Sequence, residues 1–177
     1  MNLVLIGFKA SGKSAVGRGL AKELGMRFVD LDDLIEEIYE KEHGKKSSFR
    51  EIYANHGKKF FRELENQAGE EAALLDNCII ATGGGTMIFF KNHKLLKERS
   101  KIIYLIEEPK AMLGRIRARG IPAFLNPEDL EGSMNRELEK RKPVYEKAAD
   151  YKFDIRGMML QEIPGKLISF LKDEGVL

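Results

Sequence analysis

The chain has 177 residues, of which 43% are apolar and 33% are charged, and this composition suits one soluble domain with a good core. Its single cysteine, Cys78, excludes a disulfide framework, and no stretch approaches the length of a transmembrane helix. The formal net charge of +2 gives no reason to expect a nucleic acid or a membrane as partner. We expect one domain over residues 1–177, acting in the cytoplasm as a monomer.

Short apolar runs alternate with helical stretches in the first half of the chain, as is typical of an α/β protein with a parallel sheet. Ser48 and Glu51 fit a capping box that opens a helix. The predicted elements are strands at 2–6 and 27–32 and helices at 13–24, 33–44, from 48 onward, and 58–75.

The second half continues the alternation but contains one long loop. Residues 119–132 hold two prolines, an asparagine and two glycines, and a loop of this length is usually functional or mobile. Pro109 fits the first turn of a helix. The remaining predicted elements are strands at 78–82, 101–106 and 152–155 and helices at 133–150, interrupted around Pro143, and 160–173.

The first strand leads into a phosphate-binding loop. The stretch "GFKASGKS" places Gly7, Gly12, Lys13 and Ser14 at P-loop spacing between a buried strand and a helix. Glycines let backbone N–H groups wrap around a phosphate, and the helix directs its positive end at the same anion. Lys13 is expected to reach the outer phosphates and Ser14 to hold Mg²⁺.

Two classes of P-loop protein fit poorly. A GTPase needs an Asn-Lys-x-Asp sequence, which is absent, and the "DLEG" stretch at 129–132 is better interpreted as a turn. A motor ATPase needs acids after a long apolar strand. Glu107 and Glu108 do follow an apolar run, but Pro109 comes directly after them. They are more simply interpreted as the acidic first turn of a helix. A small-molecule kinase remains.

Four further features favour a small-molecule kinase. Acids at Asp30, Asp32 and Asp33 end the second strand, where open α/β sheets bind ligands. Arg62 lies beside two phenylalanines on a predicted helix and can aim its guanidinium at a carboxylate. Three consecutive glycines follow a buried strand and expose backbone N–H groups to a ligand. The basic residues around the long loop are Arg115, Arg117, Arg119, Arg136 and Arg141.

The whole pattern resembles shikimate kinase, within the nucleoside-monophosphate-kinase-like group, from Leu3 to about Leu171. Six stretches carry the resemblance in order: "GFKASGKS", "FVDLDDLIE", "IYANHGKKFFRELE", "ATGGGT", the long loop, and "KRKPVYEKAAD". It implies a three-layer α/β/α P-loop fold with a five-stranded parallel sheet. It also implies a substrate-binding helical region at 31–62 and a lid loop at 117–132.

The resemblance implies roles for individual residues. Lys13, Asp32 and Arg119 are the implied catalytic residues, with Asp32 accepting the proton of the attacking hydroxyl, and Ser14 and Asp30 are the implied Mg²⁺ ligands. The implied shikimate site is Asp32, Arg62, Gly83, Gly84, Gly85 and Arg141, with the two arginines on the carboxylate. The implied ATP site is Gly7, Ala10, Ser11, Gly12, Lys13, Ser14, Ala15, Arg115 and Arg119, with Arg115 stacking on adenine.

The sequence departs from the family pattern in two places. The family's lid usually carries an Arg immediately before a Pro, whereas Ile121 precedes Pro122 here. Either Arg119 or Arg117 reaches the ATP phosphates from a shifted position, or the lid works without that charge. Ala10 replaces a usual glycine, and we expect this change to be tolerated.

We expect ATP-dependent phosphorylation of the 3-hydroxyl of shikimate, with Mg²⁺ as cofactor. One alternative is a kinase for another small hydroxy acid such as gluconate. The other is a nucleotide-binding module that has lost its chemistry.

Overall fold

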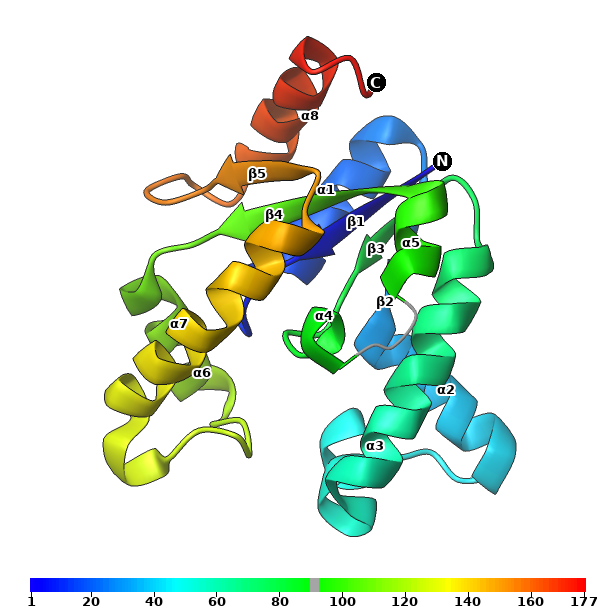
Figure 1. Ribbon diagram of the computed structural model, residues 1–177, viewed down its shortest axis with the longest axis vertical. Coiled ribbons are helices and arrows are strands. Elements are labelled where there is room, and N and C mark those ends of the chain that lie inside the picture. The colour runs from blue at the N-terminus through cyan, green and yellow to red at the C-terminus, as the bar shows by residue number, and fades with distance from the viewer. Residues whose placement is uncertain (90–92) are drawn as a thin grey trace.

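A single five-stranded sheet organises the chain, in the strand order β2-β3-β1-β4-β5 (Figure 1). The computed structural model describes residues 1–89 and 93–177. Every neighbouring pair of strands is parallel, so the carboxyl ends of all strands meet at one edge of the sheet. The expected fold class is confirmed. The strands are β1 (Asn2–Ile6), β2 (Arg27–Asp30), β3 (Cys78–Ala81), β4 (Ser100–Ile106) and β5 (Tyr151–Asp154).

Helices connect the strands and extend beyond their carboxyl ends. Helix α3 is kinked at Gly57, whose φ of 78° is non-helical, and its two halves correspond to the two helices expected there. The helices are α1 (Lys13–Leu24), α2 (Leu31–His43), α3 (Phe49–Leu74), α4 (Thr86–Phe89), α5 (His93–Arg99), α6 (Pro109–Arg119), the 3₁₀ turn η1 (Pro127–Asp129), α7 (Leu130–Ala148) and α8 (Ile163–Asp173).

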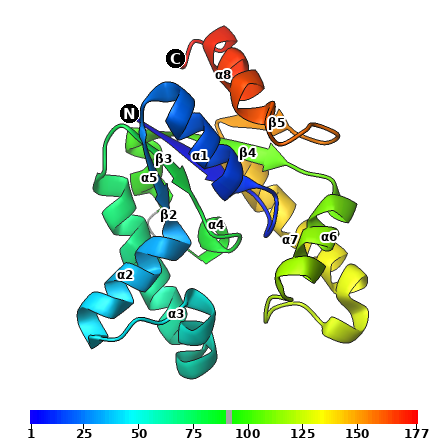
Figure 2. The same cartoon turned by 180° about the vertical axis from the view of Figure 1, so that it is seen from behind.

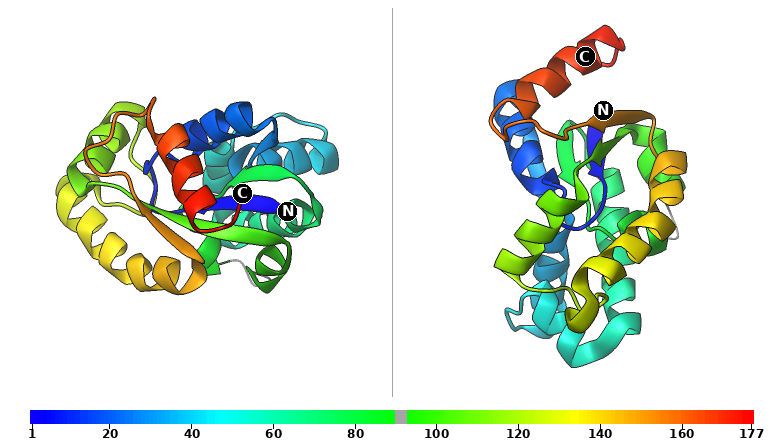
Figure 3. Two further views of the ribbon diagram at one scale, coloured as in Figure 1. Left: turned by 90° about the horizontal axis from the view of Figure 1, so that it is seen from above. Right: turned by 90° about the vertical axis from the view of Figure 1, so that its left-hand side faces the viewer.

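The helices cover both faces of the sheet and make three layers (Figures 2 and 3). Helices α1 and α8 pack on one face, where Leu3 and Leu5 of β1 point. Helices α3, α5 and α7 cover the other face, where Val4 and Ile6 point. Successive residues of one strand are therefore buried on opposite sides, which explains why the strand is apolar throughout.

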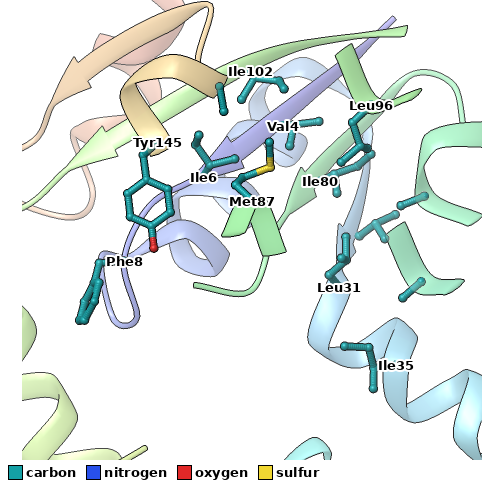
Figure 4. Close-up of a cluster of buried hydrophobic side chains, with 14 of the residues drawn as sticks. Val4, Ile6, Phe8, Leu31, Ile35, Ile80, Met87, Leu96, Ile102 and Tyr145 are labelled. Carbon is teal, nitrogen blue, oxygen red and sulfur yellow. The ribbon is translucent and has the colours of Figure 1, made fainter. Parts of the chain in front are cut away.

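The larger of the two hydrophobic clusters packs helices against one face of the sheet and reaches its carboxyl edge (Figure 4). Its side chains come from strands β1 to β4, from helices α2 to α7, and from the loop residues Phe8 and Leu125. Tyr145 of α7 reaches toward Phe8, which begins the loop after β1. The labelled members are Val4, Ile6, Phe8, Leu31, Ile35, Ile80, Met87, Leu96, Ile102 and Tyr145.

Two arms project beyond the carboxyl edge of the sheet (Figure 1). One arm is α2 with the first half of α3, and the other is α6, η1 and the start of α7. None of the helices in the described residues is long and apolar enough to cross a membrane.

Several expected boundaries were wrong, and helices α4 and α5 were not expected from the sequence. Helix α8 begins at Ile163 rather than at residue 160. Strand β2 ends at Asp30 because the Asp30 carboxylate accepts a hydrogen bond from the Asp32 N–H and caps α2. Helix α7 passes through Pro143 without a break, since Pro143 and Glu139 are exposed and water can satisfy the unpaired carbonyl. The loop expected at 119–132 is shorter, because residues 130–132 already belong to α7.

Candidate active site

The loop between β1 and α1 has the geometry of a phosphate nest. Gly7 and Gly12 have φ values of 146° and 92°, which other residues rarely adopt. A side-chain carbon at Gly7 would also lie 2.9 Å from the carbonyl oxygen of Leu105. Ser11 is buried at the turn, and Ser14 and Ala15 are exposed in the first turn of α1. The residues of the predicted motif therefore surround one helix N-terminus, where anions bind.

Lys13 lies under this nest. Its Nζ donates hydrogen bonds to the carbonyl oxygens of Gly7, at 3.0 Å, and Phe8, at 2.8 Å. Burial, with a contribution from the nearby Lys9 ammonium, lowers the pKa of Lys13 to about 8. An incoming phosphate would favour the charged form, so the lysine is suited to bind a polyanion.

Ala10 takes a strained conformation in the loop. Its φ of 64° is left-handed, which costs a non-glycine residue about 1 kcal/mol. The Arg115 guanidinium donates to the Ala10 carbonyl oxygen at 2.9 Å and pairs with Glu107 at 2.8 Å. Glu107 therefore braces the loop through Arg115 rather than lying in the first turn of α6, as had been expected, and Glu108 lies at the N-cap position of that helix. Stacking of Arg115 on adenine stays a prediction.

Asp32 faces the loop from the first turn of α2. Burial raises the pKa of its carboxyl, whereas the Lys9 ammonium, 3.6 Å from Oδ2, acts in the opposite direction. The neighbouring Asp30 is the N-cap of the same helix. Asp33 points elsewhere and pairs with Arg18 at 3.6 Å. Of the three acids predicted here, Asp32 is thus the one that borders the cavity described next.

A cavity of about 620 Å³ lies between the two arms, at the carboxyl edge of the sheet. It brings together residues that are far apart in the sequence, and five cationic and three acidic side chains line it. Its lining is Lys9, Asp32, Phe49, Arg50, Tyr53, Ala54, Lys58, Phe61, Arg62, Glu65, Gly83, Gly84, Gly85, Phe89, Ile121, Pro122, Ala123, Phe124, Glu137 and Arg141.

The three glycines after β3 form a wall that has no room for side chains. A carbon added at Gly84 would lie 2.9 Å from the backbone N of Lys9, and one at Gly85 would lie 3.0 Å from the Arg62 guanidinium. The same carbon at Gly83 would lie 3.2 Å from Asp32 Oδ1. Close approach, not a positive φ, is the reason for glycine here.

Arg62 is held in place by an acid one helical turn away. Its guanidinium pairs with Glu65, and the Glu65 carboxylate also accepts a hydrogen bond of 3.0 Å from the Thr86 hydroxyl. The guanidinium carbon lies 4.0 Å from the centre of the Phe89 ring. Within the described residues, the buried Nε of Arg62 has no hydrogen-bond partner. These contacts fix the orientation of the Arg62 guanidinium but leave it able to donate a hydrogen bond to a further acceptor.

Arg141 enters the cavity from α7 with a similar set of contacts. It pairs with Glu137 at 3.0 Å and stacks 4.2 Å from the centre of the Phe124 ring. Its guanidinium also lies 3.4 Å from the carbonyl oxygen of Gly84, which accepts a second hydrogen bond from the Tyr145 hydroxyl. The two arginines predicted to hold a carboxylate therefore line the same cavity, one from α3 and the other from α7.

The part of the expected lid loop that lines the cavity carries no charge. Ile121, Pro122, Ala123 and Phe124 face the cavity, whereas Arg117 and Arg119 are exposed at the end of α6 and do not line it. Contact between either arginine and a phosphate stays a prediction. The carbonyl oxygen of Arg119 accepts a hydrogen bond of 2.8 Å from Arg50 of the opposite arm.

Several residues around the cavity were missed by sequence reasoning. The sequence did hold a signal for two of them, since Glu65 and Glu137 stand three and four residues from the arginines they orient. Lys9, Arg50, Phe89 and Phe124 gave no such signal, because each meets its neighbours only across the folded chain.

A parallel sheet in this strand order, with a phosphate nest beside a cavity that five cationic side chains line, defines a P-loop kinase fold. A sequence model of the family described as shikimate kinase matches residues 9–172. The chain is 34% identical to the shikimate kinase of Symbiobacterium thermophilum over 178 residues, covering 99% of this chain and 98% of the relative. It is also 34% identical to the shikimate kinase of Caldanaerobacter subterraneus subsp. tengcongensis, over 98% of each chain.

Solved structures agree with the sequence relatives. The shikimate kinase from Acinetobacter baumannii in complex with shikimate has a TM-score of 0.88 at 27% identity, over 99% of this chain and 95% of that one. The shikimate kinase from Bacteroides thetaiotaomicron has a TM-score of 0.82 at 28% identity, over 97% and 98%. The chain belongs to the shikimate kinase family and is an enzyme, so the expected family is confirmed.

Proposed function

We propose that this chain transfers the γ-phosphoryl group of ATP to the 3-hydroxyl of shikimate. The observation that carries the proposal is the shared wall between the phosphate nest and the cavity. Gly84 packs against the backbone of Lys9 in the loop, while Gly83 and Gly85 border Asp32 and Arg62. A phosphate in the nest and an acid in the cavity would therefore be immediate neighbours, and positioning is a large part of phosphoryl-transfer catalysis.

The carboxylate of the substrate is assigned to the two arginines. Arg62 of α3 and Arg141 of α7 both line the cavity, and each is oriented by a glutamate of its own helix. A carboxylate can accept paired hydrogen bonds from a guanidinium fork, and it would offer an acceptor to the unpartnered Nε of Arg62. The distance between these two arginines and Asp32 then selects which ring hydroxyl of the substrate meets the phosphate.

Asp32 is assigned the proton of the reacting hydroxyl. As the hydroxyl oxygen forms its bond to the γ-phosphorus, its proton passes to the carboxylate and the bond to the β-phosphate oxygen breaks with its electron pair. Burial raises the pKa of Asp32, which makes it a better proton acceptor than an exposed aspartate. Lys13 and the loop amides hold the outer phosphates.

Mg²⁺ is assigned to Ser14 and Asp30. In the described parts of the chain no three His, Cys, Asp or Glu side chains gather into a metal site. Mg²⁺ keeps several waters and phosphate oxygens and needs only one or two protein oxygens. When bound, the ion would neutralise charge on the β- and γ-phosphates.

The finer expectations also belong to this proposal. Residues 31–62 and 117–132 would close over the substrates from the two sides, and their cavity is complete within one chain. We expect a cytoplasmic monomer. Size-exclusion chromatography would test the oligomeric state.

The test is an ADP-release assay with Mg²⁺-ATP and a panel of acids that includes shikimate and gluconate. We expect release that depends on shikimate, and nuclear magnetic resonance of the product should place the phosphate on the 3-oxygen. Turnover with gluconate and none with shikimate would reject the proposal.

Arg62→Lys should raise the KM for shikimate about tenfold or more, because lysine cannot make the two-pronged contact. Arg136→Lys, at an exposed arginine paired with Asp129, is the matched control.

A further inference from the structure

Lys9 holds a position that the mechanism above leaves without a role. It belongs to the phosphate loop, yet its side chain lines the acid cavity. Its ammonium lies 3.6 Å from Asp32 Oδ2 and 4.7 Å from the centre of the Phe49 ring. Its backbone N packs against Gly84. Lys9 thus stands at the boundary between the nest and the cavity, where a phosphoryl group must cross.

Three other cationic side chains near this boundary already have partners within their own helix or loop. Arg62 and Arg141 each pair with a glutamate on their own helix, and the Lys13 Nζ is bonded to loop carbonyls beneath the nest. Lys9 differs because its partner is Asp32, the acid assigned to the reacting hydroxyl. About a quarter of each of these two side chains is exposed, so their ion pair can open when a ligand enters.

The lid leaves an electrostatic gap that Lys9 can fill. Its cavity-facing residues, Ile121 to Phe124, are uncharged, and Ile121 stands where the family pattern has an arginine. Phosphoryl transfer spreads negative charge over the oxygens of the moving group, and a cation aimed there stabilises the transition state. In the described cavity lining, Lys9 is the cation contributed by the phosphate loop itself.

We propose that Lys9 is a catalytic residue that binds an oxygen of the phosphoryl group in transit and so replaces the missing lid arginine. In the free enzyme its ammonium is paired with Asp32. When the phosphoryl group arrives, Lys9 donates to one of its oxygens and releases the Asp32 carboxylate to accept the hydroxyl proton. The inference rests on the proposed function for the identity of the acceptor, but not for the contact with the phosphoryl group.

Lys9→Met and Lys9→Gln remove the charge and keep most of the side-chain length, whereas Lys9→Arg keeps the charge. We expect the two neutral variants to lower kcat about 10²-fold, as the loss of one transition-state donor does elsewhere. The KM for shikimate should change less than about threefold, because the contact forms only in transit. Lys9→Arg should retain activity within about tenfold of the parent. Lys152→Met, at an exposed lysine on β5, is the control.

A binding measurement separates this inference from the proposed function. MgADP with aluminium fluoride mimics the transferring phosphoryl group, and calorimetry reads its affinity without turnover. We expect the neutral Lys9 variants to bind this mimic about tenfold or more weakly and to bind MgADP alone like the parent. If the parent binds the mimic in this way but does not phosphorylate shikimate, the proposed function fails and the role of Lys9 stands.

Two results would overturn the role of Lys9. One is a neutral variant that is folded by its thermal transition and binds the mimic as tightly as the parent. The other concerns the Asp32→Asn background, which removes the charge of the ion-pair partner. If Lys9→Met no longer weakens binding of the mimic there, Lys9 acts only by holding Asp32 and does not touch the phosphoryl group.

Discussion

At the scale of single residues, the cavity charges are oriented before any ligand is bound. Arg62 and Arg141 each have a glutamate within one turn of their own helix and an aromatic ring against the guanidinium plane. A side chain held in this way loses little conformational entropy when it binds a carboxylate. Asp32 and Lys13 have pKa values shifted toward neutrality by burial, as groups that exchange protons or bind phosphates often have.

Asp32→Asn tests the proton acceptor. The amide keeps the shape but cannot accept the proton, so we expect kcat to fall about 10²-fold or more. Binding of MgATP should change less than about threefold, because Asp32 lies on the acid side of the shared wall. Coupled ADP-release kinetics and calorimetry measure the two quantities. A variant with near-parental kcat would show that another group accepts the proton.

The lowered pKa of Lys13 predicts that kcat/KM for ATP falls at alkaline pH. The pKa of about 8 belongs to the free enzyme, so the Lys13 side chain is mostly charged at pH 7 and loses its charge as the pH rises through 8. We expect kcat/KM for ATP to fall about tenfold per pH unit above that point. Bound phosphate stabilises the charged form, so kcat should hold to higher pH. A kcat/KM that stays constant to about pH 9.5 would contradict the assignment.

At the scale of elements, the two arms are joined across the cavity by Arg50. Its guanidinium donates to the carbonyl oxygen of Arg119, and a side-chain carbon at the next residue, Gly120, would lie 2.7 Å from it. Gly120 has a φ of 101°, so the chain leaves α6 through a conformation that favours glycine. The contact connects the arm of α2 and the first half of α3 to the point where the segment proposed as the lid begins.

Arg50→Ala should loosen this connection without unfolding the protein. Because the contact is exposed, we expect the free energy of unfolding to change by less than about 1 kcal/mol. The KM for shikimate should rise several-fold, and ATP hydrolysis without acid should increase because water enters the cavity more readily. Steady-state kinetics with and without shikimate measure both effects. Arg99→Ala, at an exposed arginine on α5, is the control, and identical behaviour of the two variants would exclude a link between the arms.

At the scale of the whole molecule, stability depends on both faces of the sheet. Neighbouring residues Ile79 and Ile80 of β3 are fully buried in the two different hydrophobic clusters. The cluster that holds Ile80 also contains Phe8 and Leu31, which carry the loop and the start of α2. The site is therefore supported by one face of the sheet, while α1 and α8 close the other.

Ile79→Ala and Ile80→Ala should destabilise the chain by similar amounts. Removing a buried isoleucine side chain leaves a cavity and costs about 2–5 kcal/mol of unfolding free energy. Urea unfolding with one cooperative transition would measure both values. If either variant lost less than about 1 kcal/mol, the face on which that residue points would not be a packed core.

The sequence by itself determined the phosphate loop and most of the elements, but not the short helices α4 and α5. Apolar runs, caps and the spacing of Gly7, Gly12 and Lys13 act locally, so they can be interpreted without knowing the fold. Local errors arose where neighbours compete, as when Asp30 capped α2 and ended β2 early. The resemblance supplied Asp32, Arg62 and Arg141 as candidates.

Only the tertiary structure decided which of these candidates share a cavity. It joined Arg62 and Arg141 around the wall of three glycines, left Arg117 and Arg119 outside, and brought Lys9 to Asp32. The physical reason is that parallel strands gather residues from distant loops at one edge. The distances between side chains there depend on the packing of the two arms, and no local pattern in the sequence encodes that packing.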